Sequence, residues 1–465
     1  MDATLPRNPA ARAQGSIDLP EILAWGVPLL LVLDYLGLSS EFAVLRVARV
    51  ATLAAYGMFL VVMLNGGLRV AVRSRQGRIL LALMGMAAAS LLYGVVKSYV
   101  PPMLRAQLDY FVLFVLSATV MVNRQRVKRL AVVGTMIVLI LTVRNADLLT
   151  SGLRVGTFRA GTFMGDGNDF AWGIIALMPL PLFLMLGKNN VMLRLFGLVG
   201  VGSAALAVVG TQSRGATLAV VTAGLYYWLA LSKRRMAGLV TIAALAALAL
   251  TFAPQSYFSR ITETDVQTDS SAQGRLRAWG AAFQMAVDFP LGVGVGSFNS
   301  AYGRYYMPEE DDVYSSRRWI SAHSIYFKVL GESGFLGFIL LIAVLVTNFR
   351  DNGRCLRFAR AHPESSAIED RWPALLNFGL IGYGVAGAFL GGLSYPHLYF
   401  LSGLTVACRQ MTVDRPVQAT VPAPAVVVRP VSNVALLAPR AQAPRPPAPA
   451  LPVRQPRFAS RAPRS

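Results

Sequence analysis

The chain has 465 residues, of which 55% are hydrophobic and 14% charged, and its formal net charge is +21. A soluble domain of this size needs far more charge to cover its surface, so the composition excludes an ordinary soluble globular protein. Apolar runs of roughly 20 residues, the length that crosses a bilayer, recur along most of the chain and predict a membrane protein. The first run, residues 22–38, has no small-residue cleavage site after it, which excludes a secreted protein with a removable signal.

Helix-length apolar runs follow one another from residue 21 to residue 411. We therefore expect an all-α polytopic membrane protein of about twelve transmembrane helices. In chain order they are expected at residues 21–38, 42–64, 79–97, 104–122, 130–149, 169–187, 194–211, 216–232, 236–253, 323–348, 373–392 and 396–411.

The basic residues fall mainly in alternate loops of this arrangement. Arginine or lysine follows the second, fourth, sixth, eighth and tenth helices, and the amino terminus carries Arg7 and Arg12. Because positive charge marks the cytoplasmic side, both termini are expected in the cytoplasm, and the loops between the basic ones are expected on the outer side. Topology thus accounts for the net positive charge, and a nucleic-acid partner is not expected.

Two terminal regions and one long loop lie outside the predicted helices. Residues 1–20 form a short cytoplasmic segment before the transmembrane domain, residues 21–411. Its long outer loop, residues 254–322, contains a stretch from Gly274 to Val287 with apolar residues on one helical face, which predicts a helix lying along the membrane surface. Residues 412–465 are rich in proline, alanine and arginine and predict a disordered tail, either simply solvated or in contact with anionic lipid or a partner.

The two cysteines, Cys355 and Cys408, have no metal-ligand spacing and form no disulfide framework. Both fall on the predicted cytoplasmic side, where thiols stay reduced. Since no cluster of histidine, cysteine, aspartate and glutamate has metal-ligand spacing either, we expect no metal and no cofactor.

The first candidate motif is Thr211-Gln-Ser-Arg-Gly-Ala216, between the seventh and eighth predicted helices. Arg214 lies at the outer boundary, where topology does not require positive charge. It is either an anchor that extends its guanidinium to the lipid headgroups or a phosphate ligand. The rigid, always charged guanidinium matches phosphate oxygens, and Gly215 allows close approach of the backbone.

The second motif is Ser321-Ala-His-Ser-Ile-Tyr326, where the long outer loop meets the tenth helix. His323 is either an interfacial group at a helix entrance or a general base for a sugar hydroxyl, because imidazole takes up a proton near neutral pH. Tyr326 shares its helical face and can stack on a sugar or an isoprenoid. Lys328 and Glu332, four residues apart, are expected to pair with each other in the membrane.

Two further segments carry polar residues on the outer side. Gly274-Arg-Leu-Arg-Ala-Trp279 supplies Arg275 as a second candidate for a phosphate. The glycine run at 290–298 lacks the lysine of a nucleotide-binding loop and predicts a tight turn with close backbone packing. Residues 161–169, which include Asn168, form a loop before an apolar run and predict a capped helix entrance.

In this order and on this topology, the motifs resemble the O-antigen ligase/polymerase superfamily, and in wording they are closest to the exosortase-associated O-glycosylation ligases. The resemblance covers residues 80–410. The motifs that carry it are Gly-x-Phe-x-Gly-Asp-x-Asn-Asp at 161–169, Ser-Arg-Gly at 213–215, Gly-Arg-x-x-x-Trp at 274–279, Pro-Leu-Gly-x-Gly at 290–294 and Ala-His-Ser-x-Tyr-x-x-x-Leu-Gly-Glu-x-Gly-x-x-Gly at 322–337.

This resemblance implies a metal-independent glycosyltransferase that faces the periplasm of a bacterial inner membrane. The donor would be a glycan on undecaprenyl pyrophosphate, and the acceptor a hydroxyl of a lipid, a protein or another glycan. His323 would activate the acceptor, while Arg214 and Arg275 would hold the pyrophosphate. Membrane lipids and other polysaccharide-assembly proteins are further expected partners. The candidate substrate-binding residues are Gln212, Ser213, Arg277, Asn168 and Tyr326.

The sequence leaves alternatives open. Many members of the superfamily have asparagine where this chain has Ser324, which leaves the type of acceptor open. An exopolysaccharide chain polymerase of the same superfamily fits as well as a ligase. A flippase or transporter of lipid-linked glycan fits less well, because we find no internal repeat and the polar residues gather at the outer boundary.

Overall fold

The computed structural model describes residues 21–414, apart from 43, 45–49, 152–156, most of 232–269, 308–318, 363–370 and 393–394. Residues 1–417 form one compact unit, and the second unit, residues 418–465, lies outside the described residues. The predicted amino-terminal segment, most of the ninth predicted helix, residues 254–269 of the long loop and nearly all of the tail also lie outside them.

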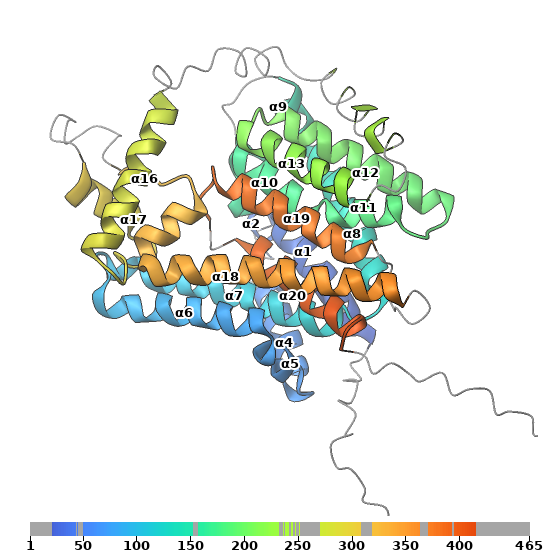
Figure 1. Ribbon diagram of the computed structural model, residues 1–465, viewed down its shortest axis with the longest axis horizontal. Coiled ribbons are helices and arrows are strands. Elements are labelled where there is room, and N and C mark those ends of the chain that lie inside the picture. Colours follow the sequence, from blue (N-terminus) through green and yellow to red (C-terminus); the bar gives the residue numbers. More distant parts are fainter. Residues whose placement is uncertain are drawn as a thin grey trace, which may run out of the picture. The chain divides into compact units, whose positions relative to one another are not determined.

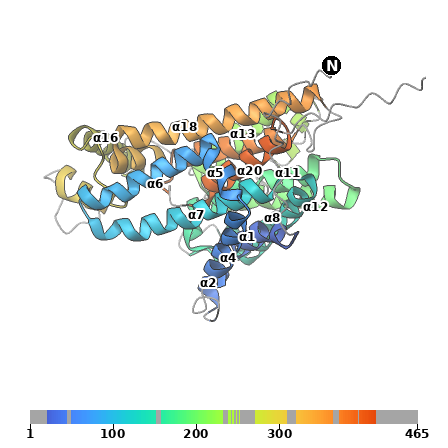
Figure 2. The ribbon, with the colours of Figure 1, turned by 90° about the horizontal axis from the view of Figure 1, so that it is seen from below.

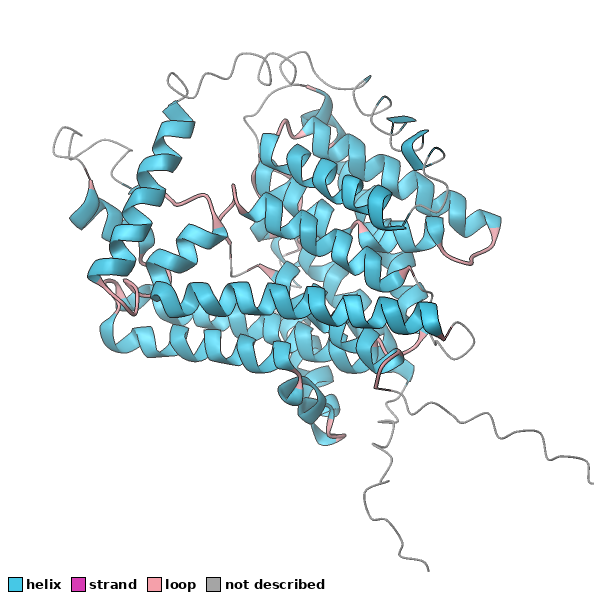
Figure 3. Ribbon diagram, viewed as in Figure 1, coloured by secondary structure: helices cyan, strands magenta, loops and turns pink. Residues whose placement is uncertain are grey.

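All regular structure in the described part of the chain is helical, and Figure 3 shows no strand there. The elements are η1 (Glu21–Trp25), α1 (Gly26–Tyr35), α2 (Leu38–Glu41), α4 (Val50–Leu64), α5 (Gly67–Arg73), α6 (Arg75–Tyr93), η2 (Lys97–Tyr99), α7 (Val100–Val120), α8 (Arg124–Arg144), α9 (Ala146–Thr150), η3 (Thr162–Met164), α10 (Gly167–Leu177), α11 (Pro179–Leu186), α12 (Val191–Gly210), α13 (Arg214–Leu231), α16 (Ser270–Asp288), α17 (Phe298–Ala301), the π-helix η4 (Tyr302–Tyr306), α18 (Ile325–Ala361), α19 (Trp372–Gly387) and α20 (Pro396–Met411). The predicted all-α fold is confirmed for these residues.

Five helical stretches are long and apolar enough to cross a membrane. They are Arg75–Tyr93, Lys97–Val120, Gly167–Leu186, Val191–Gly210 and Ile325–Ala361. A sixth is added if α4 and α5, bent by 89° at residues 65–66, count as one broken span. Helices also lie in the other predicted ranges that the structure describes, which leaves out most of the ninth, 236–253. Some of them are short: α19 and α20 each have 16 residues, fewer than the roughly 20 that a bilayer requires. The number of about twelve spans stays a prediction.

The helices pack into layers that bring distant segments together. In both Figure 1 and Figure 2, α6, α7 and α18 lie side by side, and each neighbouring pair is in contact. A second contact region joins α10, α11 and α13 to α19. Small residues allow close approach there: a Cβ on Gly379 of α19 would lie 2.7 Å from the ring of Pro179. This is the way helices pack in a bilayer, where lipid supplies no hydrophobic driving force between them.

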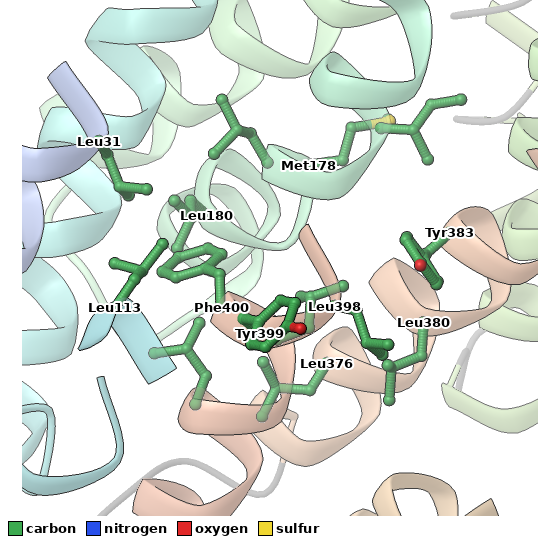
Figure 4. Packing of buried hydrophobic residues seen from close by; sticks show 14 of the residues in the cluster. Leu31, Leu113, Met178, Leu180, Leu376, Leu380, Tyr383, Leu398, Tyr399 and Phe400 are labelled. Carbon is green, nitrogen blue, oxygen red and sulfur yellow. The ribbon is translucent and has the colours of Figure 1, made fainter. Parts of the chain in front are cut away.

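Large apolar and aromatic side chains fill the space between these layers. Trp172 of α10 stacks on Tyr383 of α19 with ring centroids 5.0 Å apart, and its Nε1–H donates to the Tyr383 carbonyl oxygen at 3.1 Å. Figure 4 shows Tyr383, Tyr399 and Phe400 among leucines of several helices. This core holds α19 and α20 in place, and with them the segment between the two helices.

The helix α18 differs from the single span expected at 323–348, because it is broken at Gly334. This residue has φ +63° and ψ −168°, so α18 consists of a short helix up to Ser333 and a long one after it. A Cβ at position 334 would lie 2.0 Å from the Pro290 carbonyl oxygen, so the break requires a glycine. The short helix carries the residues that follow His323.

The glycine run at 290–298 packs against the end of this short helix. Gly292 and Gly294 have φ values of +81° and +96°. The Val293 N–H donates to the Gly331 carbonyl oxygen at 2.9 Å, and the Gly294 N–H donates to that of Glu332 at 3.0 Å. These bonds satisfy carbonyl groups that a helix end leaves unpaired. The predicted tight turn with close backbone packing is confirmed.

The helix expected from Gly274 to Val287 is present as α16, which is longer by a few residues at its amino end. Its buried face contains Ala278, Ala282 and Met285, which pack against Phe298 and Tyr302. α16 is also in contact with α18. Its apolar face is therefore covered at least partly by protein, and the expected position along the membrane surface stays a prediction.

Candidate active site

A pocket of about 270 Å³ lies between α13, α16 and the segment after α19. It is lined by Arg214, Gly215, Leu218, Ala272, Arg275, Leu276, Trp279 and Phe389. The two arginines selected from separate sequence motifs therefore line one cavity. Two guanidinium groups at one cavity are suited to an anion with several oxygens, such as a pyrophosphate.

The turn before α13 positions Arg214, the first residue of that helix. The side chains of Gln212 and Ser213 are buried, each residue being only 3% exposed. Gln212 has φ +53°, and Ser213 Oγ accepts the Ala216 N–H at 3.4 Å, which caps the helix. Gly215 was expected to let a ligand approach the backbone closely. In the structure, the side chain of Phe389 also approaches it closely, since a Cβ on Gly215 would lie 3.0 Å from Phe389.

Trp279 connects α16 to the residues around His323. It follows Arg275 by one helical turn, so both side chains face the same pocket. Its Nε1–H donates to the Ala322 carbonyl oxygen at 2.9 Å, and its ring stacks on Phe327 with centroids 4.9 Å apart and planes 11° from parallel. α16 thereby carries Arg275 to the vicinity of the histidine.

His323 lies outside the helix, two residues before α18 begins, and is exposed. Its φ of +45° places a residue with a Cβ in the left-handed region, which costs on the order of 1 kcal/mol. Such strain is common at functional sites and persists only where surrounding structure enforces it. Here the hydrogen bond from Trp279 to the preceding carbonyl group contributes to that enforcement.

Its electrostatic surroundings keep the imidazole neutral. Partial removal from water lowers the pKa of His323 below its usual 6.5, and the positive charge of Arg275 lowers it further. The negative charge of Asp166 raises the pKa of His323, and the positive charge of Lys328 lowers it. A neutral imidazole at pH 7 is the form that accepts a proton.

The loop before α10 also reaches this site. The Asp166 carboxylate accepts the backbone N–H groups of Asn168 (2.7 Å) and Asp169 (3.0 Å), so the predicted capped helix entrance is confirmed. A Cβ on Gly167 would lie 3.4 Å from the Thr211 carbonyl oxygen, which places this loop against the turn before α13. Asn168 is thus close to the arginine-bearing turn, although it does not line the pocket.

The remaining candidates lie further from the cavity. Arg277 is exposed on α16 and does not line the pocket. Tyr326 is half-buried, and its hydroxyl donates to the Gly384 carbonyl oxygen of α19 at 2.8 Å. This bond attaches the start of α18 to α19, and the role of Tyr326 in stacking on a sugar stays a prediction.

The other two histidines have different surroundings. His362 is exposed at the far end of α18, and its ring stacks on Phe358. His397 lies in the first turn of α20 and is fully buried. Its Nδ1 is 2.7 Å from the Tyr35 hydroxyl, so it forms part of the core.

The expected pair of Lys328 and Glu332 is not formed: among the described residues, no carboxylate lies within 4.0 Å of the Lys328 ammonium. Glu332 Oε1 instead accepts the Phe298 N–H at 3.4 Å. The expectation rested on their spacing of four residues along one membrane helix. The break at Gly334 brings the glycine run against Glu332 and provides its carboxylate with a backbone donor.

Sequence reasoning missed several groups of the site. Asp166 influences His323, and the Asp169 carboxylate accepts the Tyr395 hydroxyl at 2.9 Å. Lys328 lies beside Gly391, at 3.6 Å from its Cδ to the Cβ position of that glycine. The two aspartates had a signal, because the Gly-Asp-x-Asn-Asp motif directly precedes an apolar run. No sequence pattern indicated Tyr395 or Phe389, because only the tertiary structure brings these residues close to the site.

A comparison with known families matches part of the chain. Residues 198–342 match the family described as O-antigen ligase, and the matched range contains Arg214, Arg275 and His323. A search of curated proteins found no match to the chain. The family match and the apolar helices support the placement of this multi-pass membrane protein in the O-antigen ligase superfamily.

Proposed function

We propose that this protein transfers a glycan from undecaprenyl pyrophosphate to an acceptor hydroxyl at the periplasmic face of the bacterial inner membrane. The observation that carries the proposal is the pocket shared by Arg214 and Arg275, within the range that matches the O-antigen ligase family. Both arginines stay charged at any physiological pH, so the pocket attracts an anionic diphosphate.

His323 is the general base of the proposed reaction. The acceptor oxygen attacks the anomeric carbon of the donor while its proton passes to the neutral imidazole. The bond between that carbon and the phosphate oxygen breaks, and its electron pair stays with the lipid pyrophosphate. Arg214 and Arg275 hold the pyrophosphate throughout, where charge stabilisation is worth more than in water. Gln212, Ser213, Arg277, Asn168 and Tyr326 are the proposed contacts to the remainder of the substrates.

The proposed topology has this site on the periplasmic side of the inner membrane. About twelve spans with both termini in the cytoplasm put residues 150–168, 211–216 and 254–322 on the periplasmic side. The donor then reaches the site after it has crossed the bilayer. The acceptor is a lipid, a protein or another growing glycan, the last of which corresponds to a polymerase.

The test is to replace His323 by alanine in the chromosomal copy and to measure surface glycan and lipid-linked intermediates at equal protein level. We expect surface glycan to fall at least a hundredfold, as is typical for loss of a general base, and the donor to accumulate on the periplasmic face. H362A is the matched control, because His362 is exposed and distant from the pocket. Normal glycan in H323A would contradict the assigned role, and donor trapped on the cytoplasmic face would favour a flippase.

A further inference from the structure

Lys328 is a cation of the site to which the proposed reaction gives no role. It belongs to the short helix that ends at Ser333, and it is half-buried. The structure describes no carboxylate within ion-pair distance of it, and the acid expected to neutralise it, Glu332, accepts a backbone N–H. Its charge acts on the Glu332 and Asp169 carboxylates without forming an ion pair with either of them. Because removing an ammonium group from water is costly, a bound anion would stabilise it further.

The surroundings of Lys328 belong to the candidate active site. Gly391, which lies 3.6 Å from Lys328 Cδ, is also 3.8 Å from the His323 Cα, measured from its Cβ position. The charge of Lys328 influences the titration of His323 and of Asp169. Arg275, at the pocket, acts on the same histidine. Lys328 does not line the pocket of Arg214 and Arg275, but its charge and that of Arg275 both act on His323, the proposed general base.

The helix that carries Lys328 is fixed at both ends. At its start, Phe327 stacks on Trp279 and Tyr326 is bonded to α19. At its end, the glycine run donates two N–H groups to its carbonyl oxygens. A charge held on such a frame needs little reorganisation during a reaction, which is the condition for electrostatic catalysis.

The charge balance of the proposed reaction requires one more cation as it proceeds. A pyrophosphate esterified at both ends carries two negative charges, which Arg214 and Arg275 match. When the bond to the anomeric carbon breaks, the leaving phosphate oxygen gains a third negative charge. A group that binds this additional charge stabilises the transition state more than the bound donor, and so raises the rate and not merely the affinity.

We propose that Lys328 binds the phosphate oxygen that becomes the leaving group, and that it recognises the monoester form of the lipid pyrophosphate. This inference rests on the proposed function, since it assumes that the pocket holds a lipid pyrophosphate. The proton of the acceptor still passes to His323, and Lys328 keeps its own protons throughout.

The test compares two probes on the purified full-length chain in detergent. Undecaprenyl pyrophosphate is a monoester, and undecaprenyl-pyrophosphoryl-N-acetylglucosamine is a diester. K328Q is expected to weaken binding of the monoester about ten- to a hundredfold, the usual effect of one lost charge-assisted hydrogen bond, and to change diester binding by less than about threefold. K328R should retain most of the affinity. K97Q is the control, because Lys97 is an exposed lysine at the start of η2.

The variants separate failure of this inference from failure of the proposed function. R214Q and R275Q should weaken binding of both probes. If they change neither, the pocket does not hold lipid pyrophosphate and both proposals fail. If they weaken both probes while K328Q changes neither, or changes both equally, only the role of Lys328 is overturned. In cells, K328Q should lower the rate of glycan transfer at saturating donor without raising the donor concentration needed for half-maximal rate.

Discussion

At the scale of single residues, the site depends on a histidine held in an unusual backbone conformation. The motif around His323 predicted its identity and its place at a helix entrance, but no sequence pattern predicts a positive φ for a histidine. The residue before it is held by a contact made across the fold, the hydrogen bond from Trp279 to the Ala322 carbonyl oxygen. The lowered pKa of His323 has the same origin, because its partial burial and the nearby charge of Arg275 both come from segments distant in sequence.

The titration of His323 should respond in opposite directions to two substitutions. R275Q removes a positive charge that lowers the pKa, so the pKa should rise and the neutral imidazole should be lost at a higher pH than in the parent. D166N removes a negative charge that raises the pKa, so neutral imidazole should persist to lower pH. Arg275 acts from α16, Asp166 from the cap of α10, and Lys328 from α18.

The measurement is the rate at which diethyl pyrocarbonate modifies His323 as a function of pH, read by mass spectrometry of the peptide. Only neutral imidazole reacts, so the midpoint reports the pKa. The exposed His362 serves as an internal reference, and R275K, which keeps the charge, should retain the midpoint of the parent. If R275Q and D166N shift the midpoint in the same direction, the electrostatic account of this site is wrong.

At the scale of secondary-structure elements, hydropathy predicted helix positions well but not the break in α18. The apolar run continues through Gly334, and a glycine within such a run is usually tolerated. What breaks the helix is the Pro290 carbonyl oxygen, which occupies the space of a side chain at position 334. Pro290 lies 44 residues before Gly334 in the chain, so no local sequence pattern predicts this contact. The pair of Lys328 and Glu332 was misjudged for the same reason.

Replacing Gly334 by alanine should therefore destabilise the protein by at least about 1–2 kcal/mol, because a Cβ there has neither an accessible backbone conformation nor space. It should also reduce glycan transfer, since the short helix positions Lys328 and the residues after His323. Thermal unfolding of the purified protein measures the first effect. G280A is the control: no atom lies within 4 Å of the Cβ position on Gly280 in α16, so alanine there should be neutral or stabilising.

At the scale of the whole molecule, the site could be predicted from sequence only as a set of separate motifs. The arrangement of alternate basic loops placed 161–169, 211–216 and 274–323 on one side of the membrane, which is a necessary condition for a shared site. It gave no information on which side chains meet. Arg214 and Arg275 share a pocket because α16 packs on the short helix of α18 and Phe389 on Gly215, and these contacts depend on tertiary structure alone.

The number of membrane crossings can be tested at α8. The predicted topology has three crossings between Lys97 and Lys188, whereas the apolar stretches that meet the length and hydropathy criteria in that interval are two, Lys97–Val120 and Gly167–Leu186. The structure favours three. The Arg124 side chain, at the start of α8, donates to the Lys188 carbonyl oxygen at 2.8 Å, while Arg144, at its end, donates to the Leu36 carbonyl oxygen at 3.2 Å. α8 therefore connects two different ends of the bundle.

Single cysteines at these two positions give a direct readout. We expect K97C to react with a membrane-impermeant maleimide when only the outer membrane is permeabilised, and K188C to react only after the inner membrane is opened as well. The native Cys355 and Cys408 are buried and contribute little background. Because three crossings place the two positions on opposite sides and two crossings place them on the same side, equal labelling of K97C and K188C would remove α8 from the spans. It would also reverse the side assigned to every later loop, the proposed active site included.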